Sequence, residues 1–148
     1  MDKLKKINFE KKLKMRLIIC GQTTYTNEKF IRTVIISYSS CEKLVCITTD
    51  ETGVATIVKQ ICRELKIPNL IFSAQTKHIK KQAELSQIDP ESIRNNNMLN
   101  QRPDAVLSFS TGNYTGDIIT RARKMRIPVI IQRELSTEAV SGPVQALL

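Results

Sequence analysis

Side chains suited to metal binding, disulfide formation or aromatic stacking are scarce in this chain. Its 148 residues include no tryptophan, one histidine, three tyrosines and four cysteines. The cysteines form no CxxC pair, so neither a zinc site nor a disulfide framework is expected. Cys20, Cys46 and Cys62 fall in apolar stretches, where a buried thiol behaves as a small apolar side chain. We therefore expect no metal and no cofactor.

Long apolar runs are also missing. None approaches the roughly 20 residues that a transmembrane helix needs, and the N-terminus lacks a secretory pattern. We expect a cytoplasmic location and no membrane partner. Hydrophobic residues make up 41% and charged residues 25%, which is typical of a globular protein, and the length suits one domain.

Positive charge is concentrated at the N-terminus. The chain carries a formal net charge of +9, of which residues 1–16 contribute +5. We interpret residues 1–14 as a basic arm and residues 15–148 as a single domain. Such an arm can bind nucleic acid, but lysine-rich termini are more often simply solvated, and no group of aromatic residues that could form a base-stacking platform accompanies the charge. Nucleic acid is therefore the less favoured partner.

Apolar runs of strand length alternate with amphipathic helical patterns. The expected strands are residues 15–20, 43–48, 69–72, 105–109 and 128–131, and helices are expected between them. Near-continuous apolar strands indicate a parallel sheet that is covered on both faces. The sequence thus predicts an α/β, Rossmann-like three-layer sandwich with a mainly parallel sheet of about five or more strands.

Residues 73–101 are the least regular part. Asp89 followed by Pro90 has the pattern of a helix start, and the rest of the stretch is basic and polar. We expect a long loop that carries one short helix beside the ligand site.

Three turns rich in small residues follow expected strands. They are residues 21–26, beginning Gly21-Gln22-Thr23, residues 50–53, ending Thr52-Gly53, and residues 110–116. Each alone is an ordinary strand-to-helix turn. Because the carboxyl ends of parallel strands meet at one edge, the three together favour a binding cleft, where helix N-termini hold phosphate.

These motifs resemble the SLOG superfamily, and most closely its small bacterial and phage-encoded branch. The resemblance is carried by residues 15–27 (MRLIICGQTTYTN), residues 52–55 (TGVA), the R-N-x-x-M motif of residues 94–98 with Arg102-Pro103-Asp104, and residues 109–117 (FSTGNYTGD). It implies a Rossmann-like domain that binds a nucleotide or a nucleotide-derived ligand, and a homo-oligomer. The implied ligand-binding residues are Gly21, Gln22, Thr23, Thr52, Gly53, Arg94, Asn95, Met98, Ser110, Thr111, Gly112, Asn113, Tyr114, Thr115 and Gly116.

Two of these positions admit a second interpretation. Arg94 can clamp a phosphate or can pair with Asp104 or Glu91 at the surface, and the resemblance favours the ligand. Tyr114 departs from the G-G-x-G-T pattern of the family and either reshapes the loop or stacks on a base or ribose.

The chain also lacks the glutamate that follows this loop in the phosphoribohydrolase branch. Asp117 is the one candidate catalytic residue, although an Asp in the first turn of a helix is usually a cap or a dipole partner. We therefore favour a binder, either a sensor or a sponge that sequesters a signalling nucleotide, the latter a role suited to phage anti-defence. The alternatives are a nucleoside-5′-phosphate N-glycosidase and a nucleic-acid-binding protein that uses the N-terminal arm.

Overall fold

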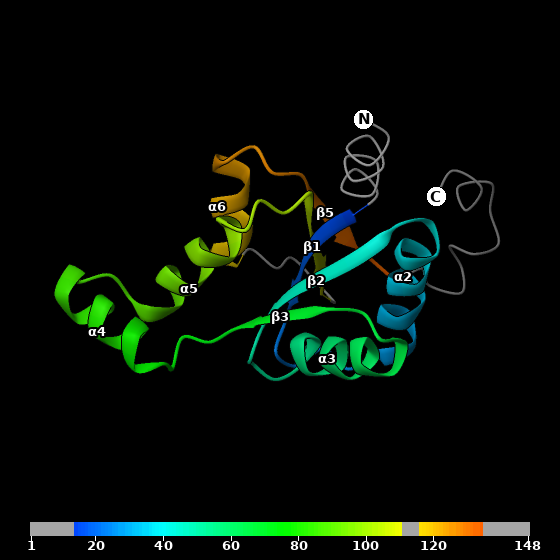
Figure 1. The fold of residues 1–148 in the computed structure, drawn as a ribbon, viewed down its shortest axis with the longest axis horizontal. Coiled ribbons are helices and arrows are strands. Elements are labelled where there is room, and N and C mark those ends of the chain that lie inside the picture. Colours follow the sequence, from blue (N-terminus) through cyan, green and yellow to red (C-terminus); the bar gives the residue numbers. More distant parts are fainter. Residues whose placement is uncertain (1–13, 111–115, 135–148) are drawn as a thin grey trace, which may run out of the picture.

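The computed structural model describes residues 14–110 and 116–134, which form a five-stranded parallel sheet with helices on both faces (Figure 1). The strands are β1 (Lys14–Gly21), β2 (Lys43–Thr49), β3 (Asn69–Phe72), β4 (Ala105–Phe109) and β5 (Val129–Gln132). The helices are α2 (Glu28–Cys41), α3 (Val54–Leu65), α4 (Lys77–Ser86), α5 (Pro90–Leu99) and α6 (Asp117–Lys124). The predicted α/β, Rossmann-like architecture is confirmed.

The strands lie in the order β3-β2-β1-β4-β5, with every neighbouring pair parallel. The chain runs outward from β1 to β3, then returns across the sheet to β4, which pairs with the other side of β1. Strand order therefore reverses between β1 and β4. In open parallel sheets, ligands bind at this point, outside the carboxyl ends of the strands.

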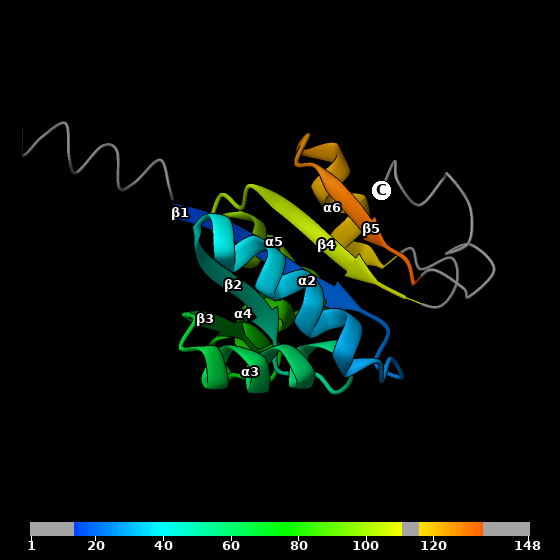
Figure 2. The ribbon, with the colours of Figure 1, turned by 90° about the vertical axis from the view of Figure 1, so that its right-hand side faces the viewer.

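Alternate residues of each central strand enter two separate cores. On one face, Leu17 and Ile19 pack against α2 and α3. On the other face, Ile18 and Val106 pack against α5 and α6. Figure 2 shows α2 and α3 on one side of the sheet and α6 on the other. This two-sided burial explains why the strands are apolar without alternating polar residues.

Local signals determine where the helices begin and end. Asn27 caps α2, since its side-chain oxygen accepts a hydrogen bond from Phe30 N at 3.1 Å. Asp89 caps α5 as expected, accepting from Ser92 Oγ at 2.9 Å and from Ser92 N at 3.0 Å, and these hydrogen bonds, the one from the hydroxyl most, lower the pKa of the Asp89 carboxyl. α3 ends at Leu65, three residues before Pro68.

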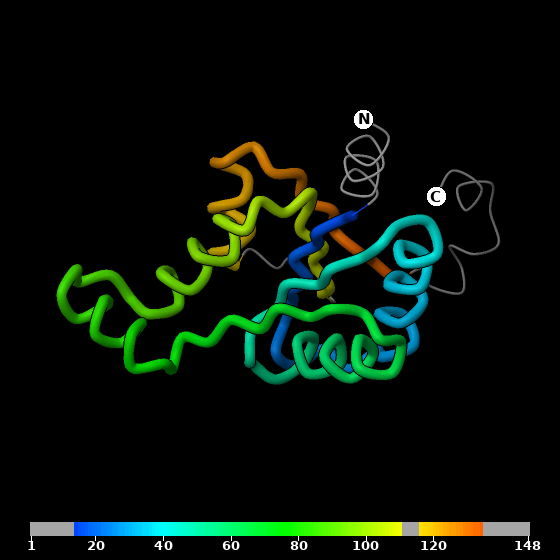
Figure 3. Tube along the Cα trace, viewed as in Figure 1, coloured from blue at the N-terminus to red at the C-terminus, as the bar shows by residue number. Residues whose placement is uncertain are grey.

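The expectation of one short helix in residues 73–101 was incomplete. This stretch forms two helices, α4 and α5, and α5 begins at Pro90. α4 is capped by Thr76, whose hydroxyl accepts from Ile79 N, and it packs on α5 through Ile79, Ala83 and Ile93. The tube in Figure 3 shows α4 lying away from the sheet, with α5 between α4 and the strands.

No helix within residues 14–110 and 116–134 is long and apolar enough to cross a membrane.

Candidate functional site

A cavity of about 180 Å³ lies at the carboxyl ends of β1 and β2, between α3 on one side and α5 and α6 on the other. Its walls come from parts of the chain that are far apart in sequence. The lining residues are Ile19, Cys20, Gly21, Thr23, Thr49, Glu51, Thr52, Ala55, Glu91, Arg94, Asn95, Met98, Asp117 and Ile118.

The cavity brings together seven of the residues singled out from the sequence. These are Gly21, Thr23, Thr52, Arg94, Asn95, Met98 and the candidate catalytic residue Asp117. Gln22, Gly53, Ser110 and Gly116 are not among the lining residues. Thr111, Gly112, Asn113, Tyr114 and Thr115 lie outside the described residues.

Two glycines allow the loops around the cavity to pack closely. A Cβ at Gly21 would lie 2.1 Å from the Phe109 carbonyl oxygen, where the ends of β1 and β4 meet. Gly53 has φ +83° and ψ −126°, and a Cβ there would lie 2.4 Å from the Thr23 carbonyl oxygen. Contact between loops therefore accounts for both glycines without a ligand.

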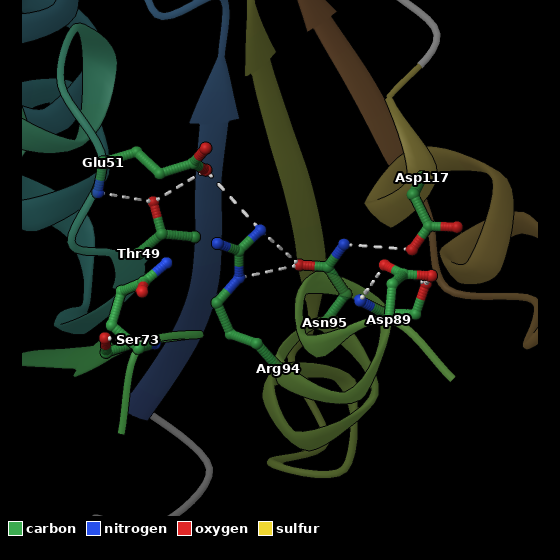
Figure 4. Close-up of polar contacts among 9 residues, drawn as sticks. Thr49, Glu51, Ser73, Asp89, Arg94, Asn95 and Asp117 are labelled. Carbon is green, nitrogen blue, oxygen red and sulfur yellow. Dashed lines mark hydrogen bonds and ion pairs between the residues drawn. The ribbon is translucent and has the colours of Figure 1, made fainter. Parts of the chain in front are cut away.

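Arg94 is buried, with 6% of its surface exposed, and its guanidinium contacts two neighbours (Figure 4). Nε and Nη2 donate to Asn95 Oδ1 at 3.2 and 3.0 Å, and Nη2 lies 3.5 Å from Glu51 Oε1. Among the described residues, Arg94 therefore pairs with Glu51 and not with Asp104 or Glu91, the two surface partners considered from the sequence. Asp104 instead accepts a hydrogen bond from the backbone N of Arg16.

Asn95 connects Arg94 to the start of α6. Its Nδ2 donates to Asp117 Oδ2 at 3.0 Å, and the same oxygen accepts from Arg121 Nε at 2.6 Å. Arg121 also donates to Asn96 through Nη1. These contacts hold the Asp117 carboxylate next to a positive charge. They give the acidic residue in the first turn of α6 a structural role that does not depend on catalysis.

Glu51 was not predicted as a site residue, yet its carboxylate faces the Arg94 guanidinium in the lining of the cavity. Thr49 Oγ1 donates to Glu51 Oε1 at 3.3 Å and accepts from the Glu51 backbone N at 3.2 Å. The turn after β2 therefore fixes this carboxylate, although 48% of the side chain is exposed. The site forms because the turn after β2 lies against α5. No local motif in the sequence predicts this contact.

The charges of the lining are mostly negative. Glu51, Glu91 and Asp117 contribute three carboxylates, while Arg94 contributes one guanidinium. Glu134, the next acidic residue after Asp117, lies elsewhere, since it accepts hydrogen bonds from Tyr25 Oη at 2.9 Å and from Asn27 Nδ2. The cavity therefore offers many hydrogen-bond acceptors and a single fixed cation.

Cys20 is the one thiol in the cavity wall. Burial raises its pKa to about 12, against a smaller lowering by the hydroxyl of Ser108, its neighbour on β4. The thiol is therefore protonated at neutral pH, which makes it a poor nucleophile. Cys46 and Cys62 are buried in the α2/α3 core, as expected.

Two helices begin beside the cavity without a side-chain cap. Gly53 precedes α3 and Gly116 precedes α6, and neither helix has a capping side-chain hydrogen bond. The first N–H groups of such helices, together with the helix dipole, attract anions. Within the described part of the chain, no group of three or more His, Cys, Asp or Glu side chains is arranged to hold a metal ion.

Comparisons of the chain with protein-family models, with curated proteins and with solved structures found no match.

Proposed function

We propose that this protein binds a nucleotide or a nucleotide-derived signal at the carboxyl ends of β1, β2 and β4, and holds it as a sensor or a sponge. The observation that carries the proposal is the position of the cavity. It is lined by the end of β1 and by the start of α6, the helix that follows β4, so it lies beside the point where strand order reverses, the usual ligand position in sheets of this kind.

The surroundings of the cavity support a ligand that carries both a phosphate and a sugar. The uncapped start of α6 suits phosphate, and the turn that leads into it has the residues expected of a phosphate loop. The cavity itself supplies carboxylates and threonine hydroxyls, which suit a neutral hydroxyl-bearing group. The resemblance to the SLOG superfamily points to the same ligand class.

Calorimetric titration with mono-, di- and cyclic nucleotides tests the proposal, and Arg94→Lys sharpens it. Lysine keeps the positive charge but loses the planar fork that contacts Asn95 and Glu51, so the arrangement of the cavity wall is lost. We expect Arg94→Lys to weaken nucleotide binding by roughly tenfold or more.

Arg32→Lys is the matched control. Arg32 also pairs with glutamates, at 3.0 Å from Glu28 and 2.8 Å from Glu64, but it lies on α2 away from the cavity. Its substitution should leave nucleotide affinity unchanged. Equal weakening by both substitutions would argue against a site at Arg94, and the absence of binding to every nucleotide would refute the proposal.

An N-glycosidase is the second candidate, favoured by one observation. Glu51 and Asp117 line the same cavity, and cleavage of a glycosidic bond commonly uses two carboxyl groups on either side of the sugar. Asp117→Asn distinguishes the two functions, because loss of turnover with retained binding would establish catalysis. The engagement of Asp117 by Asn95 and Arg121 leads us to prefer binding.

A further inference from the structure

Within the described residues, the contacts of the Glu51 carboxylate are made through one of its two oxygens. Thr49 Oγ1 and Arg94 Nη2 both contact Oε1, at 3.3 and 3.5 Å. Figure 4 shows Oε2 without such a contact to the residues drawn. The side chain is thus fixed in position while half of it remains exposed beside the cavity.

The charge of the cavity limits what enters it. A phosphate next to Glu51, Glu91 and Asp117 would meet three carboxylates, offset by the Arg94 guanidinium and by Arg121, which is paired with Asp117. A cationic group would compete with Arg94 for the Glu51 carboxylate. A neutral group that donates hydrogen bonds avoids the repulsion that a phosphate would meet, leaves this ion pair in place and satisfies the acceptors.

The size of the cavity points to a small group. Its volume of about 180 Å³ is below the roughly 300 Å³ at which pockets for drug-sized ligands begin. A pentose therefore suits the space better than a whole nucleotide. In this arrangement the phosphate and the base lie outside the cavity, with the phosphate towards the uncapped start of α6.

We propose that Glu51 accepts hydrogen bonds from the vicinal hydroxyls of a ribose, so that the site selects ribonucleotides over 2′-deoxyribonucleotides. The position fits this role, because Glu51 follows the end of β2, next to β1, where an acidic residue contacts the ribose in many nucleotide-binding α/β folds. The inference rests on the proposed function and identifies the ribose as the part of the ligand that the cavity recognises.

The test is a calorimetric comparison of the four ribonucleoside 5′-monophosphates with their 2′-deoxy counterparts. A hydrogen bond to a carboxylate gives a preference for the ribonucleotide of roughly ten- to a hundredfold. In Glu51→Gln the preference should fall to a few-fold or less, and affinity should fall further for the ribonucleotide, which loses two contacts to the carboxylate, than for the 2′-deoxyribonucleotide, which loses only the contact of its 3′-hydroxyl. A thermal melt of each variant without ligand establishes that the fold is retained.

Glu64→Gln provides a closely matched control. Glu64 pairs with Arg32 and has 44% of its side chain exposed, close to the value for Glu51, but it lies outside the cavity. The ribose preference should survive this substitution. Equal affinity for the two sugars in the unmodified protein would overturn the inference while leaving nucleotide binding intact, as would a preference that persists in Glu51→Gln. Failure to bind either series, or any of the di- and cyclic nucleotides, would refute the proposed function itself.

Discussion

Gly53 occupies a backbone conformation that residues with side chains rarely adopt. Its φ of +83° is combined with ψ −126°, and its α-carbon faces the Thr23 carbonyl oxygen. Gly53→Ala forces this backbone into strain and brings the new methyl group against the turn after β1. We expect the free energy of unfolding to fall by about 1–3 kcal/mol, measured by urea denaturation.

Gly116→Ala is the control for this prediction. Gly116 also precedes a helix, but its φ of −58° is open to any L-residue. Alanine there should cost less than about 1 kcal/mol, because only the preference of the N-cap position changes. Similar losses for the two substitutions would mean that the close approach of the Gly53 and Thr23 backbones is not what requires glycine.

At the scale of single residues, the two glutamates of the cavity could not be predicted as site residues from the sequence. Arg94 and Asn95 were predicted as site residues because they form a motif that resembles a known family. Glu51 and Glu91 belong to no such motif, and they reach the cavity because the turn after β2 faces α5. Such apposition depends on the strand order, which the alternation of apolar runs does not specify.

Among the helices, α4 packs in the smallest hydrophobic cluster. It buries Ile79 and Ala83 against Ile93 of α5, whereas α3 buries five residues in the main core. A helix of this length owes most of its stability to packing. We expect the amide hydrogens of α4 to exchange with solvent much faster than those of α3, as measured by mass spectrometry.

Two substitutions make this prediction specific. Ile93→Ala removes part of the small cluster and should accelerate exchange in α4 while leaving α3 unchanged. Leu85→Ala should have little effect, because 78% of Leu85 is already exposed. Protection of α4 equal to that of α3 would show that the pair of helices is stabilised by contacts beyond this cluster.

How well each element was predicted depended on how regular its pattern of apolar residues is. Each of the strands has Ile, Val or Leu in nearly continuous runs, so all five were expected within about two residues of their bounds. α4 was missed because only Ile79 and Ala83 of its ten residues are buried, within a basic stretch. Thr76 was the usable signal, since a threonine before a helical segment is a common N-cap.

At the scale of the whole molecule, the strand order determines where a ligand would bind. The order β3-β2-β1-β4-β5 places the carboxyl ends of β1 and β4 beside each other, with helices on opposite faces of the sheet. The fold class was predictable from the alternation of strands and helices, but the acidic character of the cavity was not.

Self-association remains a prediction that light scattering would measure. The nucleic-acid alternative depends on the basic arm of residues 1–14, of which residues 1–13 lie outside the described residues.

The central claim is that the molecule holds a nucleotide without changing it. The most direct measurement incubates the purified protein with a nucleotide that it binds, removes free ligand, releases the bound fraction by heat and identifies it by mass spectrometry. We predict recovery of the intact nucleotide in proportion to the protein. Recovery of free base and ribose phosphate, or of no ligand for any nucleotide offered, would contradict the account.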